Sequence, residues 1–170
     1  MSKRGDTDMK TFKKIVLELI KRGETIATME SCTGGAVASS ITNIEGASEV
    51  LKYSAVTYSN QYKIKMGVSS DIIEKYSVYS IETAHEMAYH ISEFANADFG
   101  IGITGKLNRA DENNNFGKDN EVFVSIYYKE KYYDIKLVVD KKTRKQNKNL
   151  IIEAIIDKLG DLLWGEELIK

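Results

Sequence analysis

The hydrophobic positions of this chain change their period several times along its length. Long stretches with apolar side chains three and four positions apart predict amphipathic helices, and short apolar or β-branched runs predict strands. The predicted helices span residues 8–22, 32–43, 60–66, 70–76, 81–95 and 143–163. The predicted strands span residues 25–29, 50–59, 99–103, 122–128 and 132–139.

The order of these elements predicts the fold class. Helices and strands alternate at first, which favours parallel strands covered by helices on both faces. The last two strands are separated by Lys-Glu-Lys, which is typical of a hairpin. We therefore expect an α/β fold, a three-layer α/β/α sandwich with a mixed, mostly parallel sheet. No linker or repeat is visible, so residues 1–170 are expected to form one domain. Residues 1–7 and the polar, Asn-rich stretch 105–120 are expected to be flexible.

Composition and charge exclude several classes of protein. Hydrophobic residues make up 42% of the 170 positions and charged residues 29%, as in ordinary globular proteins. The net charge of -1 gives no reason to expect nucleic acid as a partner. One cysteine cannot form an internal disulfide or a cysteine-based zinc site. No apolar run approaches the roughly 20 residues that span a bilayer, and the N-terminus lacks the apolar stretch of a signal peptide. A cytoplasmic protein is expected.

The strongest candidate for chemistry is Glu-Ser-Cys-Thr-Gly-Gly at residues 30–35, between a predicted strand and a predicted helix. A serine at such a turn can expose its hydroxyl beside backbone N–H groups, which an oxyanion needs during acyl transfer. Gly34 and Gly35 would let a ligand approach the backbone. Ser31 equally fits an N-cap in a tight turn. The hexapeptide alone leaves both interpretations open.

A second candidate segment, residues 57–63, follows a predicted strand at the end where α/β proteins place their sites. It contains the phenol of Tyr58 and the amine of Lys63. A lysine near a serine can act as its general base, without any histidine. The alternative is a solvated surface lysine beside a half-buried tyrosine, and spacing does not decide between the two.

Two further segments carry polar groups that could meet a ligand. Thr104 and Gly105 close a predicted buried strand and could offer a hydroxyl and an N–H, although a plain turn explains them as well. The basic run at residues 141–145, which includes Arg144, could hold a phosphate or be a solvated turn.

Two other sequence patterns are weaker candidates for chemistry. His-Glu-Met-Ala-Tyr at residues 85–89 is similar to a zinc-protease motif, but Tyr89 stands where the second histidine is needed. His85 and His90 point to different helix faces, so no metal site is expected. Cys32 at a helix N-terminus is either a reactive thiol or a small core residue.

Several of these segments together resemble the CinA C-terminal domain family, whose members include nicotinamide-nucleotide amidase. The similarity runs from about residue 9 to about residue 164. The segments that carry it are Glu-Ser-Cys-Thr-Gly-Gly at 30–35, Val-Thr-Tyr-Ser-Asn at 56–60 with Lys63, Gly67-Val68, and Ile103-Thr104-Gly105.

The resemblance implies an amidohydrolase that deamidates nicotinamide mononucleotide to nicotinate mononucleotide and ammonia through a Ser-Lys acyl-enzyme. It implies that Ser31 is the nucleophile, that Lys63 is its base, and that Tyr58 supports the lysine or shuttles a proton. The residues implied at the substrate are Glu30, Thr33, Gly34, Gly35, Thr104, Gly105 and Arg144. It implies no metal or other cofactor, and a homodimer or larger homo-oligomer. Neither nucleic acid nor a membrane is expected as a partner.

The chain departs from the family pattern in three places. The glycine-rich loop of the family is replaced after Thr104-Gly105 by Lys-Leu-Asn-Arg and an Asn-rich stretch that ends near residue 121. The interval from Lys63 to Gly67 is one residue shorter, and the family's Gly-Asp-Arg becomes Val-Asp-Lys at 139–141, with Arg144 nearby. Two functions therefore stay open: an amidase, or a catalytically weak or inactive relative that binds a nucleotide or a protein partner.

Overall fold

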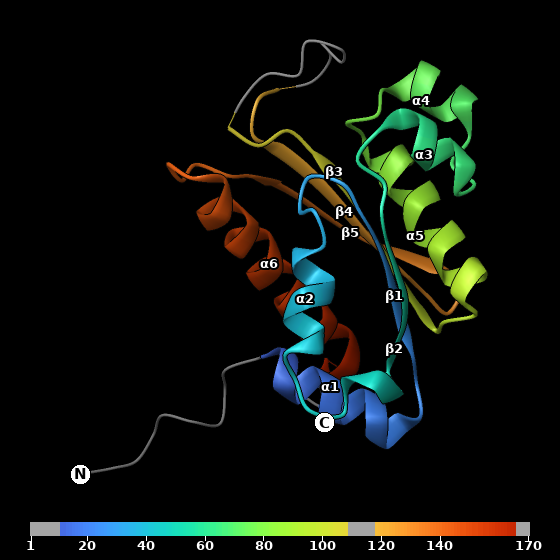
Figure 1. Ribbon diagram of the computed structural model, residues 1–170, viewed down its shortest axis with the longest axis vertical. Helices are drawn as coiled ribbons and strands as arrows, with labels where there is room; N and C mark the ends of the chain where they lie inside the picture. The colour runs from blue at the N-terminus through green and yellow to red at the C-terminus, as the bar shows by residue number, and fades with distance from the viewer. Residues whose placement is uncertain (1–10, 109–117, 166–170) are drawn as a thin grey trace.

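The computed structural model describes residues 11–108 and 118–165. Its centre is a five-stranded sheet with the strand order β2-β1-β3-β4-β5 (Figure 1). The strands are β1 (Ile26–Glu30), β2 (Leu51–Val56), β3 (Phe99–Gly105), β4 (Glu121–Tyr128) and β5 (Lys131–Val138). β1 pairs in parallel with β2 and β3, whereas β4 pairs antiparallel with β3 and β5. The predicted mixed sheet is confirmed, but parallel pairs do not outnumber antiparallel ones.

Helices cover both faces of the sheet, which confirms the three-layer α/β/α sandwich (Figure 1). α1 (Phe12–Arg22), α2 (Ala36–Thr42) and α6 (Arg144–Trp164) share one apolar core with the first face. α5 (Ile81–Ala95) packs on the second face, with α3 (Asn60–Lys65) and α4 (Ser70–Tyr76) beside it. A short 3₁₀ helix, η1 (Ala47–Glu49), precedes β2. No helix in the described ranges is long and apolar enough to cross a membrane.

The alternation of glycine along β3 explains how closely α5 approaches the sheet. A Cβ atom on Gly100 would lie 2.0 Å from the backbone oxygen of Ala88, and one on Gly102 would lie 2.3 Å from that of Ala84. Neither distance is possible between real atoms, so only glycine fits at these two positions. The alternate β3 residues, Phe99 among them, are fully buried in the core on the first face.

The helix ends follow from capping residues that are visible in the sequence. Thr11, Ser80 and Thr143 each accept a hydrogen bond from the backbone three residues later, and Gln146 completes a capping box with Thr143. The predicted hairpin is confirmed, with a two-residue turn between β4 and β5. The helix expected from residue 32 begins instead at Ala36, because residues 31–35 form a turn.

The strand register brings the candidate segments together. Glu30, the last residue of β1, is paired with Val56 of β2 and with Ile103 of β3. Ser31, Thr57 and Thr104 follow these positions directly, so all three lie at the same edge of the sheet. The predicted flexibility of residues 1–7 and of most of the 105–120 stretch lies outside the described residues.

Candidate active site

Ser31 begins a tight turn between β1 and α2. The Gly34 N–H donates to the Ser31 carbonyl at 2.9 Å, and the Ser31 N–H donates to the Ile103 carbonyl of β3 at 3.1 Å. Gly34 and Gly35 have φ angles of 61° and 93°, in the left-handed region that favours glycine. The two glycines are therefore required by the turn itself. Ser31 is nearly buried, and its side chain does not cap α2.

The Glu30 carboxylate, and not the Ser31 side chain, caps the N-terminus of α2. Its two oxygens accept hydrogen bonds from the backbone N–H groups of Val37 at 3.0 Å and Ala38 at 2.9 Å. A carboxylate at a helix N-terminus satisfies donors that otherwise have no partner. Glu30 is 0% exposed. Its side chain fixes α2 relative to β1 and thereby shapes the Ser31 turn, and its contact with substrate stays a prediction.

Lys63 lies in the last turn of α3 and meets Ser31 in the interior. Its Nζ donates to Ser31 Oγ at 3.0 Å and to the Thr57 carbonyl at 2.7 Å. The side chain is only 2% exposed, whereas lysines are seldom fully buried. The Ser59 hydroxyl caps α3 and so sets the direction in which Lys63 enters the protein. The structure thus brings together two residues that the sequence could only suggest as a pair, and the alternative of a solvated Lys63 is wrong.

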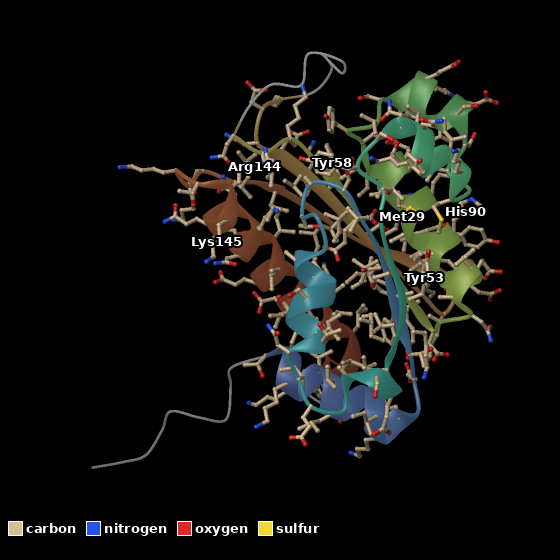
Figure 2. The ribbon with its side chains drawn as sticks, viewed as in Figure 1. Met29, Tyr53, Tyr58, His90, Arg144 and Lys145 are labelled. Atoms are coloured by element: carbon tan, nitrogen blue, oxygen red, sulfur yellow. The ribbon has the colours of Figure 1, made fainter. Side chains whose placement is uncertain are left out.

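Tyr58 lies outside this buried pair. It is 65% exposed, and its hydroxyl accepts a hydrogen bond from Arg144 Nη2 at 3.0 Å. Arg144 Nη1 also donates to the Leu107 carbonyl. Figure 2 shows the Tyr58 and Arg144 side chains side by side near the end of the sheet where β1 passes into α2. The hydroxyl is therefore bonded to Arg144 and not to Lys63, and a role for Tyr58 in catalysis stays a prediction.

The remaining predicted substrate contacts divide into two kinds. Thr104 is fully buried, and its hydroxyl donates to the Val78 carbonyl at 2.8 Å, so its side chain is not presented to a ligand. A Cβ on Gly105 would lie 2.7 Å from the Glu121 carbonyl oxygen, so β4 explains that glycine. Thr33 differs, because its buried Oγ1 has no hydrogen-bond partner among the described residues. A buried hydroxyl without a partner is uncommon and fits a position beside a ligand.

Cys32 is a core residue. It belongs to the apolar core on the first face of the sheet. Burial raises the pKa of its thiol to about 12, although the charges of Lys63 and Arg144 act in the opposite direction. The thiolate form is therefore scarce near neutral pH, and the interpretation as a reactive thiol is not supported.

The described residues contain no group of three or more His, Cys, Asp or Glu side chains that could hold a metal ion. His85 bonds to Asp134 of β5 at 2.8 Å, whereas His90 lies 3.5 Å from Glu86 on its own helix. The two histidines therefore have different partners.

Sequence reasoning missed one residue beside the Ser31 turn. Lys148 of α6 places its Nζ 3.3 Å from the position that a Cβ on Gly34 would occupy. The only sequence signal is its spacing, since it lies four residues after Arg144 and hence on the same helix face.

A protein-family model matches nearly the whole chain. The model of the CinA C-terminal domain matches residues 8–163. The chain belongs to the CinA C-terminal domain family. A relative from Clostridium kluyveri, whose name describes it as a competence-damage inducible protein, is 44% identical over 102 residues. That alignment covers 59% of this chain and 25% of the relative, so the CinA-family chain matches about a quarter of the length of such curated relatives.

Solved structures of CinA proteins have the same fold. A CinA superfamily protein from Escherichia coli superposes with a TM-score of 0.81 at 27% identity, over 93% of this chain and 94% of that chain. A competence/damage inducible protein from Agrobacterium tumefaciens gives a TM-score of 0.79 at 23% identity, over 87% of this chain and 90% of that chain. The second likeness is one of fold alone.

Proposed function

We propose that this chain is a Ser-Lys amidohydrolase whose substrate is nicotinamide mononucleotide. The observation that carries the proposal is the 3.0 Å hydrogen bond between Lys63 Nζ and Ser31 Oγ in the protein interior. Burying an amine costs stability, so such a placement needs a reason. Activation of a serine hydroxyl is one, and membership of the CinA family supports it.

In the first step, the neutral amine of Lys63 takes the hydroxyl proton while Ser31 Oγ bonds to the carbon of the carboxamide. The charge that develops on the amide oxygen requires N–H donors. The backbone N–H groups of Thr33 and Gly35 follow Ser31 and form no hydrogen bond within the described part of the chain. They are the donors that we assign to the oxyanion.

In the second step, the protonated Lys63 gives its proton to the leaving nitrogen, the C–N bond breaks, and ammonia departs. A water molecule then attacks the Ser31 ester, with Lys63 again accepting a proton. The ester bond breaks, the proton returns to Ser31 Oγ, and the carboxylic acid is released. A covalent intermediate suits an amide, because it divides one difficult hydrolysis into two easier reactions.

Ammonia release from nicotinamide mononucleotide tests this function. We expect release by the unmodified protein and none by Ser31→Ala or Lys63→Ala, with circular dichroism showing that both variants fold. A folded, unmodified protein that releases no ammonia would contradict deamidation of nicotinamide mononucleotide.

A second function is favoured by the replaced loop at residues 106–121, where the chain departs from the family pattern. In this second function, the chain is a catalytically weak or inactive member of the family that binds a nucleotide or a protein partner. The Ser31→Ala variant separates the two functions. It abolishes turnover in an amidase, whereas a binding protein keeps its affinity.

We also propose that the chain associates as a homodimer or larger homo-oligomer, as the family resemblance implies. Static light scattering of the purified protein measures its mass directly. A monomeric mass at every concentration would contradict this proposal.

A further inference from the structure

Helix α6 directs one positive charge at the Ser31 turn. Lys148 is half-buried, and its Nζ lies 3.3 Å from the position that a Cβ on Gly34 would take. The ammonium group therefore lies against the backbone of the turn that carries Ser31. A larger residue at position 34 would contact it.

A second positive charge lies on the same face of α6. Arg144 precedes Lys148 by four residues, which is about one helical turn. Its guanidinium is held by the Tyr58 hydroxyl and the Leu107 carbonyl. Both of these partners are uncharged. The charge of Arg144 also acts on Cys32, the residue after Ser31, where it opposes the rise in the thiol pKa caused by burial.

Neither cation is neutralised by an acidic side chain in the described ranges. The ion pairs found there involve other basic residues, such as Arg22 with Glu18 and Lys136 with Glu121. Two cations on one helix face, one of them half-buried against the turn that carries Ser31, create a positive potential at that turn. An anionic group of a ligand would gain charge-assisted hydrogen bonds there.

We propose that Lys148 is a specificity-determining residue, which with Arg144 binds a phosphate monoester on the molecule whose amide reaches Ser31. The proposal rests on the amidase function for the reacting group, but its own test requires binding alone. Arg144 supplies a planar guanidinium whose orientation is fixed by two hydrogen bonds. Lys148 supplies a mobile point charge that can follow the phosphate.

The test compares two ligands that differ by one phosphate, nicotinamide mononucleotide and nicotinamide riboside. Calorimetric binding is measured on Ser31→Ala protein, so that no turnover occurs. We expect Lys148→Gln to weaken binding of the mononucleotide roughly tenfold to a hundredfold, with riboside binding unchanged. Lys148→Arg, which keeps the charge, should restore most of the mononucleotide affinity.

Lys145→Gln is the matched control, because it removes the same charge from the same helix, three residues before Lys148. Lys145 is exposed, and Figure 2 shows it on the side of α6 away from the sheet. We expect it to leave the affinity for the mononucleotide within about twofold, as for an exposed and screened charge. An equal loss from Lys145→Gln would show a diffuse field and overturn the assignment to Lys148.

Other outcomes also decide the proposal. Equal binding of both ligands, or no binding of either, would overturn it. If phosphate-dependent binding depends on Lys148 but the protein with Ser31 intact releases no ammonia, the amidase function fails and this inference stands. If ammonia is released and Lys148→Gln leaves KM unchanged, the amidase function stands and this inference fails.

Discussion

Two groups of residues near Ser31 differ in burial and in the way their positions are fixed. The inner group consists of Glu30, Ser31, Thr57 and Lys63. The outer group consists of Tyr58, Arg144 and Lys148. Members of the inner group are buried and joined to one another or to the α2 backbone by hydrogen bonds. The outer group is exposed or half-buried, and Arg144 is held by the Tyr58 hydroxyl and the Leu107 carbonyl.

Under the proposed function, this difference in burial separates the groups that react from the groups that select the substrate. A nucleophile and its base must be held within a few tenths of an ångström, which burial and short hydrogen bonds provide. A residue that selects a charged substrate has to remain accessible to it. The inner group lies in segments that match the CinA pattern, whereas α6 begins where the chain departs from it. Under the proposed function, the reacting groups therefore lie in segments that match the family pattern, whereas Arg144 and Lys148 follow a segment that departs from it.

The largest expected effect is the loss of the buried amine. Lys63→Ala should lower the rate of ammonia release by about a thousandfold or more, because general-base catalysis contributes roughly 10²–10⁴ and the serine also loses its hydrogen bond. KM should change little, since the outer group is untouched. Lys65→Ala, an exposed lysine on the same helix, is the control and should keep near-normal activity. Comparable losses in both variants would contradict the separation of the two groups.

A second prediction concerns the support of the Ser31 turn. Glu30→Ala removes the carboxylate that accepts from two N–H groups of α2, and leaves the buried donor of Val37 and the part-buried donor of Ala38 without this acceptor. We expect a loss of about 2–4 kcal/mol in the free energy of unfolding, together with a fall in kcat as the turn relaxes. Denaturant unfolding measures the first effect. Glu49→Ala, at an exposed carboxylate in η1, should cost less than about 0.5 kcal/mol.

Much of the fold could be predicted because its determinants are local. Apolar spacing predicted α1, α5 and α6, and their ends follow from Thr11, Ser80 and Thr143, which cap them through bonds within three residues. The strands also followed from local composition. The beginning of α2 could not be predicted, because residues 31–35 form a turn that depends on the Glu30 carboxylate and two left-handed glycines.

Sequence motifs predicted individual residues of the candidate site, but not the contacts between residues that lie far apart in the sequence. Ser31 and Lys63 were suggested by motif and resemblance, but their contact depends on the register of β1 against β2. The partner of Tyr58 is 86 positions away in sequence, so its bond to Arg144 could not be expected. Lys148 carries no motif at all. It becomes visible only when α6 is packed against the turn at Gly34.

The third prediction concerns Gly34, where Lys148 of the outer group lies against the turn that carries Ser31 of the inner group. Gly34→Ala should lower the free energy of unfolding by about 1–2 kcal/mol, the cost of a side chain at a φ of 61°. It should also weaken binding of nicotinamide mononucleotide severalfold, because the new Cβ displaces Lys148. Gly23→Ala is a matched control, with a φ of 65° and no atom within 4 Å of the added Cβ. It should cost similar stability and leave binding unchanged, and equal effects on binding would contradict contact between Gly34 and Lys148.

The smallest expected effect decides which group Tyr58 belongs to. Tyr58→Phe removes the hydroxyl that accepts from Arg144 at 3.0 Å and leaves the ring in place. If Tyr58 only orients Arg144, KM for the mononucleotide should rise about twofold to fivefold with kcat unchanged, because a single exposed hydrogen bond contributes roughly 0.5–1 kcal/mol. If instead it passes a proton to or from Lys63, kcat should fall at least about tenfold with little change in KM. The observed bond favours the first result. If the phenol acts through the guanidinium, Tyr58→Phe should add no further KM defect in protein that already carries Arg144→Gln, and an additive defect in steady-state kinetics would contradict this.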